Sequence, residues 1–324
     1  MKMLKKYRSI LIIAVLLLVF LLSITYQMNG SEKENEQRKR ISFIVYGDDS
    51  ERWENIRQGA GLVCDEYGAD VSLITMMSDD DAEEQKQIIE REAADGADAV
   101  IIAACNSAAI RDYVESGAVK VPVVFIESVS DLGAGYKSIA PDDYKMGYDL
   151  GCEVAESEKD IATIAIISDN TNRDNAILRE KGFRDAIKGR FAKVINWTRD
   201  YNTKRSNTRT FIQKAIVSEA TDVIVTFDNT TTDALLDALT NLNKKSKVYS
   251  ISTSDKAVYS LNKKDIKALM YTDEFSMGYL AAMYAVDNKN AIKKYSHRVI
   301  DYRIVRKEDM YDEGNQTLLF PFVN

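Results

Sequence analysis

The feature that most constrains the fold is a regular alternation of apolar runs with helical patterns from Ile41 onward. The runs have the length of buried strands, about four to eight residues, and the segments between them carry apolar residues at helical spacing. Strands that are apolar throughout are typical of a parallel sheet with helices on both faces. The alternation therefore predicts an α/β fold.

The alternation forms two successive units of ordinary domain size. The first contains the runs ISFIVY, DVSLITM, DAVIIAA and VPVVFIE, with helices expected near 53–67, 81–95 and 107–116. The second contains IATIAIIS, AKVIN, TDVIVTF, KVYSIS and IKALMY, with helices expected near 175–188, 205–219, 229–243 and 254–261. Ligands of open α/β sheets bind beyond the carboxyl ends of the strands, so two facing units would hold a ligand between them.

The first 28 residues predict a membrane segment. A basic stretch, MKMLKKYR, precedes an apolar run from Ser9 to Tyr26. This run of about 18 residues is at the short end of a spanning helix and longer than most signal-peptide cores. A retained anchor is favoured over a cleaved secretory signal, because Ser23 and Thr25 form a poor cleavage pattern. The basic flank stays in the cytoplasm, so we expect a single-pass protein of the cell membrane whose folded part is extracytoplasmic.

The composition limits the partners of the folded part. The chain has 324 residues, a net charge of -7 and a pI near 5.1, without a long block of lysine and arginine. This charge pattern argues against nucleic acid as a partner. Residues 29–40, NGSEKENEQRKR, are polar throughout and are expected to form a tether to the membrane.

The sequence carries no motif for catalysis or for a cofactor. It has no GxGxxG, no GxxxxGK[ST] and no GxSxG pattern. Cys64, Cys105 and Cys152 are far apart, and the one histidine, His297, has no partner at a metal-ligand spacing. The three aspartates at 79–81 directly precede an expected helix, so we interpret them as capping residues rather than metal ligands. We therefore expect a binding protein and not an enzyme, with no cofactor and no metal.

Seven stretches follow one another along the chain: IVYGDDSERW, GADAVIIAAC, VPVVFIES, SIAPDDYKMGYDLG, RDNAILREKGF, TDVIVTFDN and ALMYTDEFSMGYLAA. Together they resemble the type I periplasmic binding proteins, the family that includes the ribose-binding protein and the effector domains of LacI-type repressors. They occur in the family's order and cover most of the chain from Ile41 to about Arg306. No helix-turn-helix precedes them, which argues against a repressor.

The resemblance implies two similar Rossmann-like lobes with parallel sheets, joined by three chain crossings that act as a hinge. One N-terminal transmembrane helix would precede them here. The implied first lobe is 41–140 plus 274–294, and the second is 141–273 plus 295–312. Residues 1–28 would be the basic flank and anchor, and residues 313–324 a tail.

Family ligand contacts come from loops that follow the strands, and the matching positions of the first lobe are Asp49, Arg52, Trp53, Asn106 and Glu127. Asp49 and Glu127 can accept hydrogen bonds from hydroxyl groups. Trp53 can either stack on the C–H face of a sugar ring or pack in the core from the first turn of a helix. For Glu127, the alternative is an ordinary solvated loop residue.

The matching positions of the second lobe are Arg179, Asp228, Thr253, Thr272 and Asp273. Arg179 lies four residues before Phe183, as does the ligand-binding arginine of the family; the alternative is a buried salt bridge with a neighbour such as Asp228.

Two departures bear on the ligand. Sugar binders commonly place an aspartate where this chain has Ser252, Thr253 and Ser254, and the family's proline after the last crossing is Glu274. These departures leave other small polar metabolites open beside pentoses and hexoses.

The resemblance implies a solute-binding protein that closes over a small polar ligand, sugar-like in character, and delivers it to the permease of an ABC transporter. The alternative output is a ligand-sensing co-receptor for a membrane histidine kinase or similar sensor. An extracellular glycosidase that uses Asp49, Glu127 or Asp228 is the least favoured hypothesis, because it needs two carboxyl groups at a fixed separation.

Overall fold

The computed structural model of the protein describes residues 20, 38–47, 50–78, 80–133, 135–159, 163–169, 172–191, 193–199, 208–287 and 299–320. Residues 39–324 form one compact unit. The expected membrane segment lies outside the described residues apart from Phe20, as do Asp49 and His297. Within the described ranges, no helix is both long enough and apolar enough to span a bilayer.

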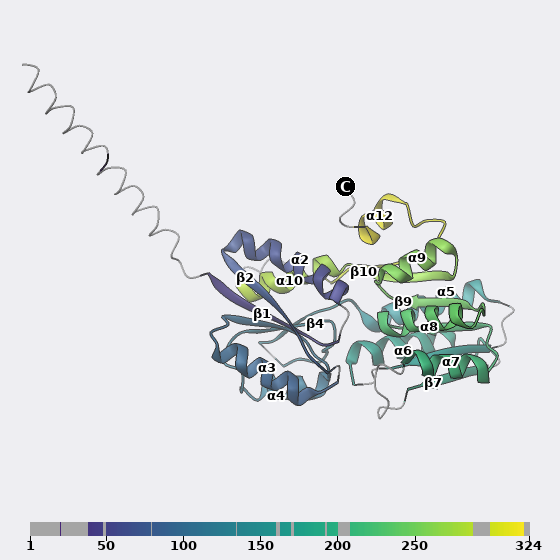
Figure 1. Cartoon of the computed structure of the whole chain (residues 1–324), viewed down its shortest axis with the longest axis horizontal. Coiled ribbons are helices and arrows are strands. Elements are labelled where there is room, and N and C mark those ends of the chain that lie inside the picture. Colours follow the sequence, from purple (N-terminus) through teal and green to yellow (C-terminus); the bar gives the residue numbers. More distant parts are fainter. Residues whose placement is uncertain are drawn as a thin grey trace, which may run out of the picture. The chain divides into compact units, whose positions relative to one another are not determined.

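The first lobe is built on a five-stranded parallel sheet in the order β2-β1-β3-β4-β5. The strands are β1 (Lys39–Val45), β2 (Ala69–Thr75), β3 (Ala99–Ala103), β4 (Val123–Ile126) and β5 (Lys137–Ile139). Helices cover both faces, with α2 beside α10 on one and α3 beside α4 on the other (Figure 1). These helices are α2 (Ser50–Tyr67), α3 (Ala82–Ala94), α4 (Ser107–Glu115) and α10 (Glu274–Val286).

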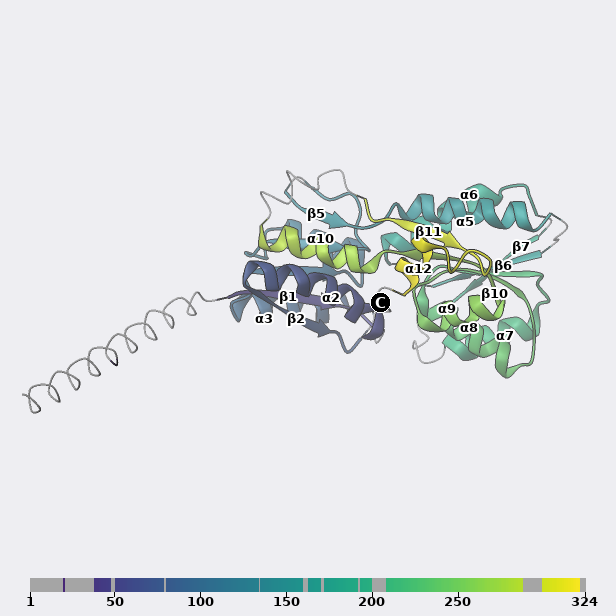
Figure 2. The same ribbon diagram turned by 90° about the horizontal axis from the view of Figure 1, so that it is seen from above.

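The second lobe is built on a six-stranded sheet in the order β11-β10-β9-β8-β6-β7, parallel except for β11. Its strands are β6 (Thr163–Ser168), β7 (Lys193–Thr198), β8 (Val223–Thr226), β9 (Lys247–Ile251), β10 (Ile266–Thr272) and β11 (Tyr302–Val305). The pair α5 and α6 lies on one side of this sheet, opposite α7, α8 and α9 (Figure 2). The helices are α5 (Asp143–Ser157), α6 (Asp174–Ile187), α7 (Thr208–Ser218), α8 (Asn229–Asn241), α9 (Asp255–Lys263) and α12 (Glu313–Leu319).

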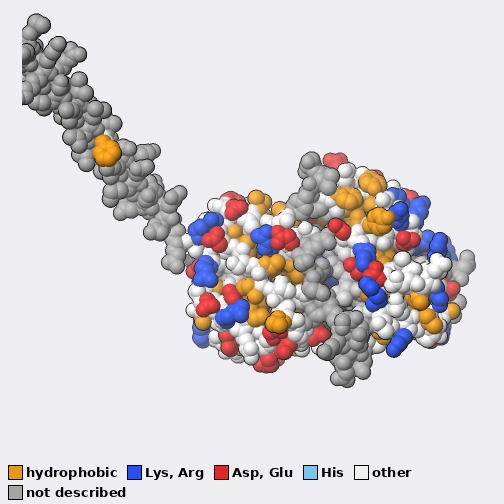
Figure 3. All heavy atoms as spheres, in the orientation of Figure 1, with side chains coloured by type: hydrophobic (Ala, Val, Ile, Leu, Met, Phe, Trp, Pro, Cys, Tyr) orange, Lys and Arg blue, Asp and Glu red, His pale blue; other side chains and the backbone are white. Residues whose placement is uncertain are grey.

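The structure confirms the α/β fold with two parallel-sheet lobes. Every residue of β3, β4 and β8 is buried, as expected for strands with helices on both faces. The expected capping role of the acidic run before α3 is also confirmed, since the Asp81 carboxylate accepts hydrogen bonds from the backbone N–H groups of Glu83 and Glu84. Basic and acidic side chains are interspersed over the face seen in Figure 3.

Some element boundaries differ from the sequence expectations. β1 begins at Lys39, two residues inside the segment expected as a tether, because Lys39 and Arg40 already pair with β2. α12 forms inside the segment expected as a tail and buries Leu319 in the second lobe. β5 and β11 were not expected as strands; both are short and lie at the edges of their sheets.

The chain crosses between the two sheets after β5, after β10 and before β11. It leaves the first sheet after Ile139 and enters α5 at Asp143, and it returns from Thr272 of β10 to Glu274 of α10. It reaches the second sheet again at Tyr302. In Figure 1, α10 in light green accordingly lies beside purple α2, from which it is distant in the sequence.

Candidate functional site: a polar cavity between the lobes

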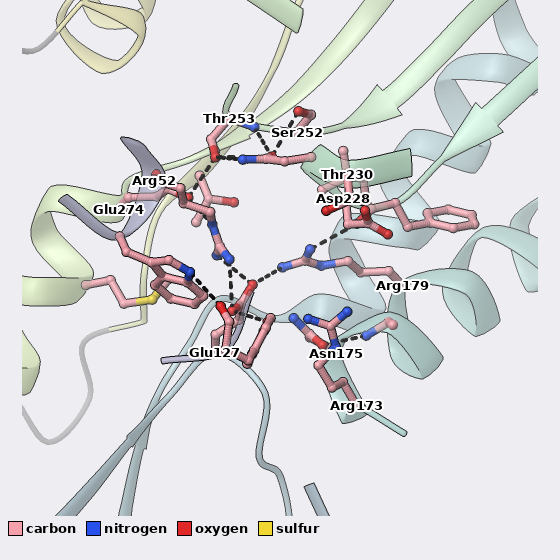
Figure 4. Close-up of a pocket in the computed structure, with 18 residues that line it drawn as sticks. Arg52, Glu127, Arg173, Asn175, Arg179, Asp228, Thr230, Ser252, Thr253 and Glu274 are labelled. Atoms are coloured by element: carbon pink, nitrogen blue, oxygen red, sulfur yellow. Dashed lines mark hydrogen bonds and ion pairs between the residues drawn. The ribbon is translucent and has the colours of Figure 1, made fainter. Parts of the chain in front are cut away.

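A small cavity lies between the two lobes, lined by residues that follow β1, β4, β6, β8, β9 and β10. It leaves about 50 Å³ for the centres of water molecules. Since one water needs about 10–15 Å³ by this measure, the cavity has room for only a few water molecules. Figure 4 shows that polar and charged side chains surround it, with α6 on one side and α10 on the other.

The structure brings seven of the ten expected ligand residues together around this cavity. Asn106 and Asp273 are not among the lining residues, and Asp49 lies outside the described part of the chain. The seven are Arg52, Trp53, Glu127, Arg179, Asp228, Thr253 and Thr272.

Asn106 and Asp273 instead cap helices. The Asn106 side chain accepts a hydrogen bond from Ala109 N–H at the start of α4. Asp273 does the same for Ser276 N–H at the start of α10 and lines a separate groove. A strand-end Asn or Asp that precedes a helix satisfies otherwise unpaired backbone N–H groups, which accounts for the placement of both side chains.

Arg52 joins two carboxylates at the cavity wall. Its guanidinium makes a two-point contact with Glu127, with Nη2 to Oε1 at 2.6 Å and Nη1 to Oε2 at 3.1 Å. Its Nε donates to Glu274 Oε1 at 2.6 Å. A two-point contact between a guanidinium and a carboxylate fixes the orientation of both groups. All three residues belong to the first lobe, so the network shapes that half of the cavity.

Glu127 is held as a carboxylate, with its side chain 3% exposed. It adopts a positive φ of 63°, and its backbone N–H donates to the Ile139 carbonyl, so the chain turns sharply after β4. Burial raises the pKa of Glu127, but Arg52 and then Arg179 outweigh burial and bring it down to about 2. Tyr46 donates its hydroxyl to Oε2 at 2.9 Å. The alternative of a solvated loop residue is therefore wrong.

Arg179 reaches the cavity from α6 of the second lobe and is also part of a buried ion pair. Its Nε donates to Asp143 Oδ1 at 2.7 Å and its Nη1 to the Phe227 carbonyl at 3.1 Å. Its Nη2 lies 3.9 Å from Glu127 Oε1, across the lobe boundary (Figure 4). Burial raises the pKa of Asp143 to about 6, although Arg179 opposes the shift. The buried ion pair is therefore present, with Asp143 rather than Asp228 as its carboxylate partner, and the ligand contact of Arg179 stays a prediction.

Trp53 lies in the core although its edge reaches the cavity. It is 1% exposed and makes edge-on contacts with Phe43 and Tyr46, and its indole N–H donates to the Tyr46 carbonyl at 2.8 Å. The Arg52 guanidinium carbon lies 4.7 Å from its ring centroid. Core packing therefore describes Trp53 better than sugar stacking, because an arginine already contacts the ring.

The second-lobe wall consists of amide and hydroxyl groups next to an aspartate. Asp228 caps α8 through a bond from Thr231 N–H, and it lies beside the cavity (Figure 4). Asn229 accepts from Thr253 N–H and from Ser252 Oγ, and Thr253 Oγ1 donates to Glu274 Oε1 at 2.7 Å. The missing sugar-binder aspartate is thus replaced by a hydroxyl that meets a carboxylate of the opposite lobe.

Arg173, Asn175 and Glu274 are charged or amide side chains of the lining that the sequence did not predict as ligand contacts. Arg173 is 9% exposed, and its guanidinium carbon lies 4.1 Å from the Tyr46 ring centroid. Its Nε has no hydrogen-bond partner among the described residues. Arg173 and Asn175 precede Arg179 at the start of the same helix, and this position after β6 is the only signal that pointed to them.

The lining carries three arginines, Arg52, Arg173 and Arg179, and three carboxylates, Glu127, Asp228 and Glu274. Opposite charges of equal number suit a ligand rich in both hydrogen-bond donors and acceptors. Such an arrangement is chemically able to bind and orient polar groups.

Residues 41–292 match a family model described as the periplasmic binding protein domain. The chain belongs to this family. Its membership confirms the resemblance found in the sequence, and it confirms a binding protein rather than an enzyme. No curated protein matches the sequence of this family member.

Solved structures share the fold at low identity. A carbohydrate transporter solute-binding protein from Agrobacterium radiobacter, in complex with D-arabinose, is 20% identical with a TM-score of 0.78, covering 88% of this chain and 100% of its own. An ABC transporter solute-binding protein from Agrobacterium vitis, with bound D-fucose, is 18% identical with a TM-score of 0.71 and covers 87% and 100%. A chain of the XylFII–LytSN complex is 19% identical with a TM-score of 0.68 and covers 84% and 99%.

Proposed function

We propose that this protein is an extracytoplasmic solute-binding protein that takes up a small polar, sugar-like ligand between its lobes and delivers it to the permease of an ABC transporter. The observation that carries the proposal is the cavity itself, where Arg52 and Glu127 of the first lobe face Arg179 and Asp228 of the second. The carbohydrate transporter protein that shares the fold was solved with D-arabinose, which favours a sugar as the ligand class.

The lobes would act as two rigid bodies, with boundaries near 41–140 plus 274–294 and 141–273 plus 295–312. Binding pockets for small molecules commonly have about 300–1,000 Å³, far more than the closed cavity leaves. Entry of a ligand therefore requires the lobes to separate, and closure would bring arginine donors and carboxylate acceptors onto its hydroxyl groups.

A thermal-shift panel tests the ligand class. The full chain is heated with D-arabinose, D-fucose, D-allose, D-glucose or D-galactose, each at millimolar concentration. A sugar present at 100 times its Kd adds about 2.7 kcal/mol of stability, so at least one member should raise Tm by several degrees. If no member of the panel changes Tm, the carbohydrate proposal fails.

The structural likeness to a chain of the XylFII–LytSN complex supports a second candidate output, a co-receptor that reports the ligand to a membrane sensor. Cross-linking of the full chain in its native membrane, followed by mass spectrometry, separates the two outputs. Capture of a permease supports delivery, and capture of a histidine kinase supports sensing.

We also propose that the apolar run of residues 9–26 is a retained membrane anchor. The basic flank and the poor cleavage pattern of the sequence support it. Alkaline carbonate extraction of cell membranes should leave the protein in the pellet, and the intact mass should include the N-terminus. Release of a shorter chain into the supernatant would indicate a cleaved signal.

A further inference from the structure

A second set of contacts joins the lobes outside the ligand cavity. Ser130 of the first lobe donates its N–H and its Oγ to Asp174 Oδ2 of the second, at 2.8 and 2.6 Å. Ser107 N–H donates to the Asn172 carbonyl at 2.9 Å, and Asp174 N–H donates to Ser107 Oγ at 2.9 Å. We call Ser107, Ser130, Asn172 and Asp174 the interlobe latch. None of the four is among the residues that line the cavity.

The latch is built from two helix starts that meet. Ser107 is the first residue of α4, and Asp174 is the first residue of α6. Ser107 is fully buried, and its hydroxyl donates to the Ser128 carbonyl while it accepts from Asp174. A carboxylate at a helix N-terminus is favoured by the helix dipole, and bonds to it are stronger than those between neutral groups. The latch therefore joins the lobes by bonds that need no ligand.

The latch also holds the start of α6, whose residues face the cavity, against the first lobe. Arg173 and Asn175 flank Asp174, and Arg179 follows about one and a half turns later. On the other side, Ser130 lies three residues after Glu127 on the same loop. With Asp174 bonded to Ser130, Arg173 lies against Tyr46 and Arg179 lies 3.9 Å from Glu127. The latch thus sets the distance between the two walls of the site.

We propose that the interlobe latch holds a closed form in the absence of ligand and thereby sets the ligand affinity, with Asp174 and Ser107 as positioning residues that do not touch the ligand. The affinity part rests on the proposed binding function, whereas the closed ligand-free form does not. Apparent affinity scales with the fraction of protein in the binding-competent form, so loss of the latch weakens both closure and binding. Loss of even one hydrogen bond to a charged group corresponds to at least about tenfold in the closed-to-open ratio.

Hydrogen exchange on the ligand-free full chain tests closure without any sugar. The variants are Asp174→Ala in the second lobe and Ser107→Ala in the first. The amide of Ser130 in the Ser107→Ala variant should exchange about fivefold faster, because a neutral bond between the lobes is lost, and the amide of Ser107 in the Asp174→Ala variant should exchange at least about tenfold faster. Each of these amides keeps its own acceptor, so faster exchange reports separation of the lobes. Small-angle scattering should show a larger radius of gyration for both variants.

Two matched substitutions control for local effects. Asp185→Ala removes a carboxylate of α6 that, in the part of the chain the structure describes, accepts from Tyr144 of the same lobe. Ser116→Ala removes a hydroxyl at the end of α4 that donates to the Tyr113 carbonyl. Both should leave the exchange of Ser107 and Ser130 unchanged. The proposal is overturned if the latch variants keep wild-type exchange at these amides, or if the amides inside α6 accelerate equally, which would indicate fraying of the helix.

A binding titration with the most stabilising sugar of the panel tests the effect of the latch on ligand affinity. Both latch variants should bind it up to about tenfold more weakly, and the two controls should match the wild type. Unchanged affinity in variants that have lost closure would overturn the positioning role. If no sugar binds the wild type, the exchange arm still decides whether the latch closes the lobes, so the two proposals fail separately.

Discussion

At the scale of single residues, the arginines around the cavity differ in what they contact. Arg52 is satisfied by Glu127 and Glu274 of its own lobe, and Arg179 by Asp143 and a backbone carbonyl. Arg173 lies over an aromatic ring of the opposite lobe. Arg173 therefore offers the clearest way to change the site without breaking a buried ion pair, whereas Arg179 combines a structural role with a site role.

Removal of Arg179 should cost stability as well as binding. Arg179→Ala leaves the buried Asp143 carboxylate unpaired, which costs about 3 to 5 kcal/mol. The double variant with Asp143→Ala should recover part of that loss, and urea unfolding of the two single variants and the double variant measures the coupling. Arg184→Ala on the same helix breaks a partly exposed pair with Glu180 and an exposed hydrogen bond to Asn196, and it should cost about 1 kcal/mol. Additive losses would contradict the coupled pair.

Glu127 should make the protein sensitive to acid. Its pKa falls from an ordinary 4.5 to about 2 in the folded state, so the unfolded chain binds more protons between these values. Its contribution is present above pH 4.5 and is lost as the pH falls toward 2, by about 2 kcal/mol between pH 7 and pH 3. Asp143 acts in the opposite sense, because its pKa is raised to about 6 and its contribution is lost as the pH rises through that value.

Urea unfolding of the wild type and of Glu127→Gln at pH 7 and pH 3 measures this dependence. The glutamine variant should be less stable at pH 7 and should lose less stability on acidification than the wild type. An equal loss in both proteins would show that Glu127 does not titrate as described.

At the scale of elements, close helix contacts determine where the site residues lie. α5 and α6 approach so closely that a Cβ on Gly147 would lie 1.9 Å from the Arg179 carbonyl oxygen. α2 and α10 meet in the same way at Gly278, where a Cβ would lie 1.8 Å from the Ile56 carbonyl oxygen. These glycines allow the backbones to approach, and the first pair holds Arg179 at the cavity.

Gly147→Ala should therefore destabilise the protein by about 1 to 3 kcal/mol and displace α6. Gly61→Ala in α2 is the matched control, because a Cβ there meets nothing within 4 Å. The control should be neutral or gain up to about 1 kcal/mol from its better helix propensity. Thermal unfolding compares the two; similar stabilities would show that α5 and α6 do not need the close approach.

The sequence predicted most elements because buried parallel strands and amphipathic helices leave clear patterns. The expected helix near 229–243 is α8 at Asn229–Asn241, and the run KVYSIS contains β9. The sequence did not predict β5, because three residues are too few to show a hydrophobic period. It did not predict β11, because this strand alternates partly exposed and exposed residues before its buried end. A hydrophobic period can be recognised only over several residues, because a shorter match arises by chance.

The site was harder to predict than the fold. A polar residue between a strand and a helix can either cap the helix or face the ligand. Asn106 and Asp273 cap their helices. Arg173 and Asn175 face the cavity because the opposite lobe packs beside the start of α6. Contacts between distant segments carry no local signature, so the sequence alone does not reveal them.

At the scale of the whole molecule, the two lobes meet through both the cavity and the interlobe latch. The loops of the two sheets converge on the same region, and the chain crosses between the sheets beside it. Motion at the crossings would open the cavity, and closure would bury the ligand away from water. In the proposed function, one ligand therefore contacts both walls of the cavity.

Isothermal titration calorimetry of the full chain with the most stabilising sugar of the panel tests most directly whether a sugar binds between the two lobes. Arg173→Met is the comparison, because it removes at similar size a guanidinium that lies over the Tyr46 ring and whose pKa is raised, against burial, by Tyr46, Asp228 and Glu127. We expect one-site binding by the wild type and at least tenfold weaker binding by Arg173→Met, in a variant whose cooperative thermal unfolding shows that it is folded. Equal affinity in the two proteins, or no binding of any sugar by the wild type, would contradict a sugar site between the lobes.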